Sequence, residues 1–226
     1  MIAAHNLVFG RKYGGNGDKI LDLPLQNNFT DTTGINTMIA GGTSNLPTFT
    51  LEAAEYAATF NNSQSLKTAS NFILNSDKVS ISVWMKTSQT QQSILIELSS
   101  NSDNTNAFYL TPNNGIQTGL GLRNRNGSNY SFFTSPWTLN AWNHVVCIID
   151  RANPITSECK IYVNNISTSS LLLSSGEVNG NFGLFPLFIG QRGGNSHGFN
   201  GQLKFLKIFN YLISTTEITN LYNKTI

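Results

Sequence analysis

The chain is built from short runs in which hydrophobic and polar residues alternate, and almost none of it repeats at helical spacing. Residues 79–87 (VSISVWMKT) show the pattern, because their odd-numbered positions are hydrophobic through Met85 and their even-numbered positions are mostly polar. An alternation of period two places the hydrophobic side chains on one face of an extended strand. We therefore predict a strand here, with one face in a hydrophobic core and the other largely exposed to water.

Similar runs recur along the chain, separated by Gly, Asn, Ser and Pro. They predict strands at residues 20–25, 57–60, 65–69, 79–87, 93–99, 107–111, 116–123, 130–134, 142–150, 158–164, 184–190 and 201–210. About a dozen strands without helices to cover a parallel sheet favour an all-β fold, either an antiparallel β-sandwich or a barrel.

One helix is predicted, at the C-terminal end. Ser214 and Glu217 have the spacing of a capping box, and Ile218, Leu221 and Tyr222 follow at helical spacing. We expect this short helix to close an edge or a corner of the sandwich.

Composition and charge narrow the range of functions. The 226 residues are enough for one large domain or two small ones, and 14 basic and 12 acidic residues are scattered without the basic tract of a nucleic-acid-binding protein. No apolar run reaches the length of a membrane span, and the first residues lack the features of a signal peptide. Two cysteines exclude a disulfide-rich fold, and we expect Cys147 and Cys159, on two arms of one predicted hairpin, to be free, partly buried thiols.

Six sequence blocks occur in a fixed order between about residues 20 and 224. They are LDLPLQNNFTDTTG, AATFNNSQSLKTAS, VSISVWMKTS, WTLNAWNHVVCIIDRANPITSECKIYVNN, PLFIGQRGG and GFNGQLKFLKIFNYLISTTEITNLYN. Together they resemble the laminin-G-like jelly roll of the concanavalin A-like lectin/glucanase superfamily. The resemblance implies an antiparallel β-sandwich (jelly roll) over residues 20–226 with a short C-terminal helix. It implies less about function, because this fold hosts lectins, hydrolases, adhesion modules and structural domains.

Two departures from the family pattern bear on chemistry. Many members hold calcium with an acidic pair in the last strand, where this chain has Lys204 and Phe205. Asp31 is therefore the one candidate metal ligand, and the alternative is that it caps a turn; we predict no cofactor apart from possible calcium. The glucanases of the superfamily place carboxylates at alternate positions of one strand, whereas here Glu97 has only Asp103 nearby, in a loop. No catalytic residues are predicted, and His144 is expected to be structural.

Two loops carry side chains suited to sugar binding. Arginine and amide groups can form paired hydrogen bonds to neighbouring hydroxyls, and an aromatic face can cover the C–H side of a sugar ring. The predicted ligand-binding residues are Arg123, Arg125, Tyr130, Trp137, Gln191, Arg192 and His197. Two alternatives stay open: these are solvated loop residues, and Trp137 plugs the core.

Residues 1–19 differ in character from the rest and are predicted to form an N-terminal arm docked on a partner. Their few hydrophobic side chains would each contribute about 1.5–3 kcal/mol, less in sum than the ordering cost of about 1–2 kcal/mol per residue. With the initiator Met and the low charge, the arm favours a subunit of an exterior assembly such as a phage or virus particle. The prediction is a non-catalytic, lectin-like or adhesive module that binds carbohydrate or a cell surface, without nucleic acid or membrane insertion. The alternatives are a structural decoration or cementing subunit and a glycoside hydrolase.

Overall fold

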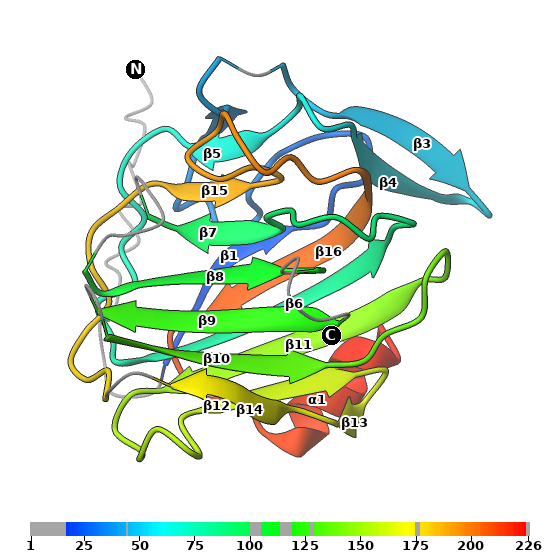
Figure 1. Ribbon diagram of the computed structural model, residues 1–226. Helices are drawn as coiled ribbons and strands as arrows, with labels where there is room; N and C mark the ends of the chain where they lie inside the picture. Colours follow the sequence, from blue (N-terminus) through cyan, green and yellow to red (C-terminus); the bar gives the residue numbers. More distant parts are fainter. Residues whose placement is uncertain are drawn as a thin grey trace, which may run out of the picture.

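The computed structural model describes residues 17–43, 45–99, 105–113, 119–126, 129–174 and 177–224. Within these ranges the chain forms two antiparallel eight-stranded sheets and one helix, and Figure 1 shows the sheets stacked as two layers. This arrangement confirms the predicted antiparallel β-sandwich.

Sheet A is centred on β6. Its strands in spatial order are β13 (Ile166–Ser167), β12 (Cys159–Val163), β11 (Asn143–Asp150), β6 (Lys78–Lys86), β16 (Gly201–Phe209), β4 (Glu55–Phe60) and β3 (Thr48–Glu52), and β1 (Lys19–Leu23) also pairs with β16. A register shift between Lys204 and Lys207 interrupts β16, and Phe205 adopts a positive φ of 53° there. This bulge allows β16 to pair with β4 before it and with β1 after it.

Sheet B is the second layer. Its strands in spatial order are β14 (Ser170–Ser174), β10 (Asn129–Ser135), β9 (Leu120–Asn126), β8 (Ala107–Thr111), β7 (Ile96–Leu98), β15 (Leu187–Ile189), β5 (Leu66–Thr68) and β2 (Met38–Ala40). The facing sides of the two sheets enclose one hydrophobic core, with Ile81 and Val83 from sheet A and Leu110 and Leu122 from sheet B fully buried in it. The opposite sides are called here the outer faces.

Helix α1 (Thr215–Tyr222) begins with the predicted capping box between Ser214 and Glu217. It does not close an edge or a corner of the sandwich as expected. Ile218 and Leu221 instead pack with Val146 and Ile148 on the outer face of sheet A. The expectation that the polar face of β6 is wet was therefore wrong for part of that strand.

Ser80 and Ser82, on that face of β6, are buried. The hydroxyl of Ser80 donates to the carbonyl of Tyr211 and accepts from the backbone N–H of Ile213, in the segment that leads into the helix. These two hydrogen bonds replace those that the buried Ser80 hydroxyl would otherwise make with water.

Four observed strands were not predicted: β2, β3, β13 and β14. In the β3–β4 hairpin the two turn residues, Ala53 and Ala54, both have positive φ values, 46° and 72°. Such turns usually contain Gly, Asn or Asp, so an Ala-Ala turn gives no sequence signal.

Both cysteines are free and buried, as Cys147 is the register partner of Ile161 and Cys159 that of Ile149. Burial raises the pKa of both thiols, which therefore stay protonated.

Candidate functional site

A row of side chains crosses the outer face of sheet B. Strand pairing places Glu97 of β7 beside Tyr109 of β8, Tyr109 beside Arg123 of β9, and Arg123 beside Phe132 of β10. Register partners in a sheet point to the same side, so these residues share a face. Their neighbours Ile96, Leu110 and Leu122 alternate with them into the core.

Arg123 lies between two tyrosines on this face. Its guanidinium carbon is 3.9 Å from the ring centre of Tyr130 and 5.7 Å from that of Tyr109, and its Nη1 donates to the Tyr109 hydroxyl at 3.2 Å. Its Nε is buried and has no hydrogen-bond partner among the described residues. Stacking fixes the plane of the guanidinium and leaves hydrogen-bonding capacity unused.

The Gly-rich loop after β15 brings a second arginine to the same tyrosine. The guanidinium carbon of Arg192 is 5.4 Å from the Tyr109 ring centre, so the two arginines share one aromatic neighbour. A Cβ atom at Gly194 would lie 2.6 Å from the backbone nitrogen of Gly42, and Gly194 has a φ of 78°. Glycine is therefore required where this loop packs against the turn at residues 41–42.

Glu97 lies fully buried beneath this loop. Its Oε2 accepts a 2.9 Å hydrogen bond from the backbone N–H of Gly193, whereas its Oε1 is 4.0 Å from Arg192 Nε and makes no hydrogen bond among the described residues. Burial raises the pKa of Glu97 to about 7, against the opposing effects of the Gly193 N–H and the Arg192 charge. Glu97, Tyr109, Arg123, Tyr130 and Arg192 are called here the arginine–tyrosine cluster.

A buried arginine supports the strand ends beside this cluster. Arg151 donates from Nε to Asn124 Oδ1 at 2.9 Å and from Nη2 to the carbonyls of Ala107 and Arg125, and its guanidinium lies 3.8 Å from the Phe182 ring centre. It thereby ties β8 to β9 from the interior. The sequence analysis did not single out Arg151, because one arginine after a strand carries no distinctive pattern.

The remaining predicted ligand residues fall into different places. His197 is half-buried in the same loop, with its pKa lowered by burial and by the nearby Arg192 charge. Arg125 pairs with Tyr130 across the β9–β10 hairpin. Gln191 is buried, and its side chain donates to the Asn62 carbonyl at 2.7 Å, while Trp137 packs against the core and donates to the Pro112 carbonyl at 2.9 Å. The structure thus brings together Arg123, Tyr130 and Arg192, with His197 nearby, and places Gln191 and Trp137 in structural contacts.

Tyr109 and Glu97 are the members of the cluster that were not predicted to bind a ligand. Tyr109 lies mid-strand in AFYLT, and its position between two arginines depends on the pairing of β8 with β9 and on the return of the 190–194 loop. Neither is visible in the local sequence.

Asp31 forms the centre of a turn. Its carboxylate accepts hydrogen bonds from the backbone N–H groups of Asp22, Thr33 and Asn36 and from the side chains of Thr33 and Asn36. Burial alone would raise the pKa of Asp31, but these hydrogen bonds outweigh it and lower the pKa. Lys204, in the last strand, pairs with Glu55. The donors occupy the lone pairs that calcium would use, and the described residues contain no cluster of three or more acidic, His or Cys side chains. In the structure the Asp31 carboxylate therefore caps its own turn, and calcium binding there stays a prediction.

The outer face of sheet A buries His144. Its Nε2 lies 2.9 Å from Ser82 Oγ, and its ring packs against Trp84 and Tyr222 at centroid distances of 5.2 and 5.9 Å. Burial lowers the pKa of His144 to about 4. Asp103, the other carboxylate considered with Glu97, lies outside the described residues.

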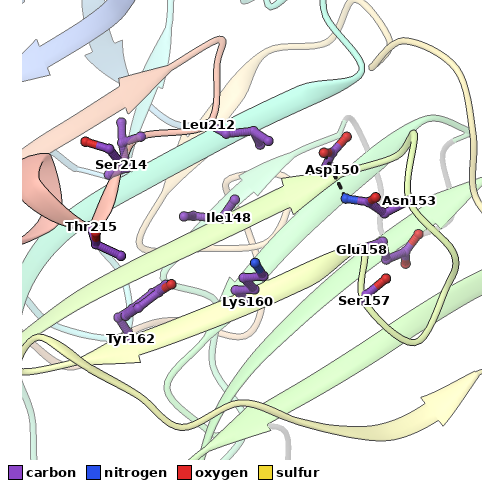
Figure 2. Close-up of a pocket in the computed structure, with 11 residues that line it drawn as sticks. Ile148, Asp150, Asn153, Ser157, Glu158, Lys160, Tyr162, Leu212, Ser214 and Thr215 are labelled. Carbon is purple, nitrogen blue, oxygen red and sulfur yellow. Dashed lines mark hydrogen bonds between the residues drawn. The ribbon is translucent and has the colours of Figure 1, made fainter.

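A separate cavity of about 240 Å³ opens on the outer face of sheet A, beside the start of α1. Figure 2 shows its lining, which comes from β11, β12, the turn between them and the segment before the helix. The lining residues are Ile148, Asp150, Asn153, Ser157, Glu158, Lys160, Tyr162, Leu212, Ile213, Ser214 and Thr215. The cavity and the arginine–tyrosine cluster thus lie on the outer faces of different sheets.

Comparison with known proteins agrees with this architecture. A family model described as the concanavalin A-like lectin/glucanases superfamily matches residues 60–219, and the chain belongs to this family. Among curated proteins, no sequence matches. No helix in the described ranges is long and apolar enough to cross a membrane.

Several solved structures share the fold. Domain 4 of AbnA, an extracellular arabinanase from Geobacillus stearothermophilus solved with arabinotriose, is 15% identical with a TM-score of 0.72, covering 92% of this chain and all of that domain. The binding domain of Paraclostridial Mosquitocidal Protein 1 is 15% identical with a TM-score of 0.66. The binding domain of Botulinum Neurotoxin DC, in complex with SialylT, is 16% identical with a TM-score of 0.65. The last two matches cover 92% of this chain, which spans about half of each toxin domain.

Proposed function

We propose that this chain is a non-catalytic carbohydrate-binding module and that its arginine–tyrosine cluster binds a glycan carrying an acidic group. The observation that carries the proposal is the position of Arg123 and Arg192 around the ring of Tyr109. Arabinotriose and SialylT accompany two of the structural neighbours, which supports a sugar as the class of ligand.

The charge balance of the cluster favours an acidic group. Two guanidinium groups stand against one carboxylate, and burial shifts that carboxylate toward its neutral form. An anion placed at the arginines would form charge-assisted hydrogen bonds, which are about twice as strong as neutral ones. The partly exposed ring of Tyr130 would contact the C–H side of the sugar, whereas Tyr109 is buried and holds the two arginines in place.

The same geometry argues against a hydrolase. A glycosidase needs two carboxyl groups on either side of the scissile bond, about 5–9.5 Å apart. The cluster contains one, Glu97, and it is buried under the Gly-rich loop with no exposed surface. Its hydrogen bond to Gly193 supports a role in positioning the loop.

The test is binding to an array of acidic and neutral glycans, followed by titration calorimetry on the best ligand. We expect Arg123→Gln and Arg192→Gln each to weaken binding by about 1–3 kcal/mol, because each loses a charged hydrogen bond. Lys67→Gln is the matched control, since Lys67 lies on the outer face of sheet B two strands from Glu97. Absence of binding to every glycan, even with a multivalent display of the protein, would refute the proposal.

Display of the module on an exterior assembly, such as a phage or virus particle, stays a prediction. It depends on the N-terminal arm at residues 1–19, of which residues 1–16 lie outside the described ranges. In the described part of the arm, residues 17–19, Asp18 exchanges hydrogen bonds with Asn210 and Lys19 begins β1. Adhesion to a cell surface and a purely structural role in such an assembly likewise stay predictions.

A further inference from the structure

The cavity shown in Figure 2 is bounded by two kinds of surface. Ile148 and Leu212 supply apolar side chains, and Leu212 is 37% exposed. Lys160 and Tyr162 project from alternate positions of β12 onto the same face, where their register partners on β11 are Ile148 and Val146. A cavity of about 240 Å³ is slightly smaller than the roughly 300–1,000 Å³ of pockets for drug-sized ligands, so it suits one small ring.

Three polar groups that line this cavity make no hydrogen bond or ion pair with other groups of the described chain. In the part of the chain that the structure describes, the Lys160 ammonium, the Tyr162 hydroxyl and the Thr215 hydroxyl have no hydrogen-bond or ion-pair partner, and Figure 2 labels all three residues along the lining. They come from two separate segments, β12 and the first position of α1. Three donors around an apolar floor form the combination that holds a sugar by its hydroxyl groups and its C–H face.

The residues that line the cavity have no excess of positive charge, unlike those of the arginine–tyrosine cluster. Asp150 accepts from the Asn153 side chain at 2.9 Å and lies 3.6 Å from Lys78, so its charge is already paired. Glu158 is buried, and its carboxylate accepts from Ser131 in the interior. The lining therefore carries two carboxylates and one ammonium, that of Lys160, so it has no excess of positive charge that would favour an acidic sugar.

We propose that this cavity is a second carbohydrate site, which binds one neutral sugar unit through Lys160, Tyr162 and Thr215. Because the cavity lies on the outer face of sheet A and the arginine–tyrosine cluster on that of sheet B, the module would bind two glycans at once. Two such sites on one rigid domain would allow it to cross-link glycans or to gain avidity on a glycan-coated surface.

The experiment is an NMR titration of the full chain with three neutral methyl glycosides: β-D-glucopyranoside, β-D-galactopyranoside and α-L-arabinofuranoside. Glucuronate is the acidic comparison. We expect saturable shift changes at Ile148, Tyr162 and Thr215 with at least one neutral glycoside, and weaker binding of glucuronate there. No saturable change at these residues with any neutral glycoside, or tighter binding of glucuronate, would overturn the proposal.

Two variants assign the effect to the cavity. Tyr162→Phe removes only the hydroxyl and keeps the ring, and Lys160→Met keeps most of the side-chain stem, so both should fold. Each should weaken the neutral glycoside about three- to tenfold, the loss expected for one hydrogen bond. The matched control is Tyr56→Phe on β4, four strands away in the same sheet, and it should change nothing. Unchanged affinity in both cavity variants would contradict the assignment.

This inference and the proposed function can fail separately. Arg192→Gln should abolish or weaken acidic-glycan binding and leave the neutral titration at Tyr162 unaltered. Lys160→Met should do the reverse. If Arg192→Gln also weakened the neutral glycoside as much as Lys160→Met does, a separate second site would be ruled out.

Discussion

The outer face of sheet A buries His144 under helix α1, whereas the outer face of sheet B buries Glu97 under a Gly-rich loop. Around His144 the contacts are aromatic rings and one hydroxyl, from Trp84, Tyr222 and Ser82. Around Glu97 they are a backbone N–H and an arginine 4.0 Å away. The same sandwich therefore buries one ionisable group in an apolar setting and another in a charged one.

The different surroundings of His144 and Glu97 follow from the elements that cover them, helix α1 and the 190–194 loop. Helix α1 satisfies its own backbone groups and contributes Ile218 and Leu221 to a hydrophobic cluster, so it can close the face and stabilise it. The 190–194 loop has Gly at three of five positions and brings few hydrophobic side chains, so it depends on polar contacts. The contacts over His144 are those of a packed structural surface, whereas under the loop the Nε atoms of Arg123 and Arg192 make no hydrogen bond among the described residues.

The largest predicted effect is on the free energy of unfolding, and it should arise on the outer face of sheet A without affecting that of sheet B. Leu221→Ala should lower the free energy of unfolding by about 2–4 kcal/mol, because it leaves a cavity under the helix, while glycan binding by the folded protein stays unchanged. Leu51→Ala is the control, since Leu51 is 58% exposed and should cost less than about 0.5 kcal/mol. Urea denaturation and calorimetry measure the two quantities. Loss of binding in folded Leu221→Ala protein would show that the faces are coupled.

The second prediction concerns pH and gives opposite signs for the two buried groups. The pKa of His144 falls to about 4 in the folded state, so its contribution to stability is full above about pH 6.5 and is lost as pH falls toward 4. The pKa of Glu97 rises to about 7, so its contribution is full below about pH 4.5 and is lost as pH rises through 7. Between pH 7.5 and 5 each amounts to about 2 kcal/mol, and they oppose each other.

In the parent protein the two contributions partly cancel. Variants that remove one group should therefore show a clear dependence of the free energy of unfolding on pH. Glu97→Gln should lose stability on acidification from pH 7.5 to 5, and His144→Gln should gain it. Both are measured by urea denaturation across the range, and only the slopes are compared because either substitution can shift the baseline. Identical pH slopes in the two variants would contradict the assignment of these groups.

Most of the fold could be predicted because period two is a direct consequence of strand geometry. In β6 and β11 one face is continuously hydrophobic, and both strands were found within one residue of their ends. The unpredicted β3 (TFTLE) does alternate, but it is an exposed edge strand and its Ala-Ala turn carries none of the usual turn residues. The unpredicted β13 has only two residues, too few to show a period.

The candidate site could be predicted only in part. Arg123 and Tyr130 lie on one hairpin, so their proximity follows from local sequence. Tyr109 and Glu97 join them through strand pairing, and Arg192 joins them through a loop some 70 residues later. These positions depend on the topology of the sheet, which the local sequence does not reveal. Trp137 and Gln191 resemble ligand residues by type, but the carbonyl groups that they contact belong to distant loops.

The smallest predicted effect is the change in melting temperature when calcium is removed. A large change would mean that calcium binds near β1, and the sheet A side would then be a metal-dependent ligand surface. The Asp31 carboxylate already accepts five hydrogen bonds, and Lys204 in β16 forms an ion pair with Glu55. We therefore expect a chelator to shift the melting temperature by less than about two degrees. A ligand at a hundredfold excess over its Kd stabilises by about 2.7 kcal/mol, so loss of a bound calcium ion would lower the melting temperature by several degrees. Thermal unfolding with and without chelator, and with calcium restored, decides between the two; Asp31→Asn is the companion variant, and it should destabilise the turn equally in both conditions.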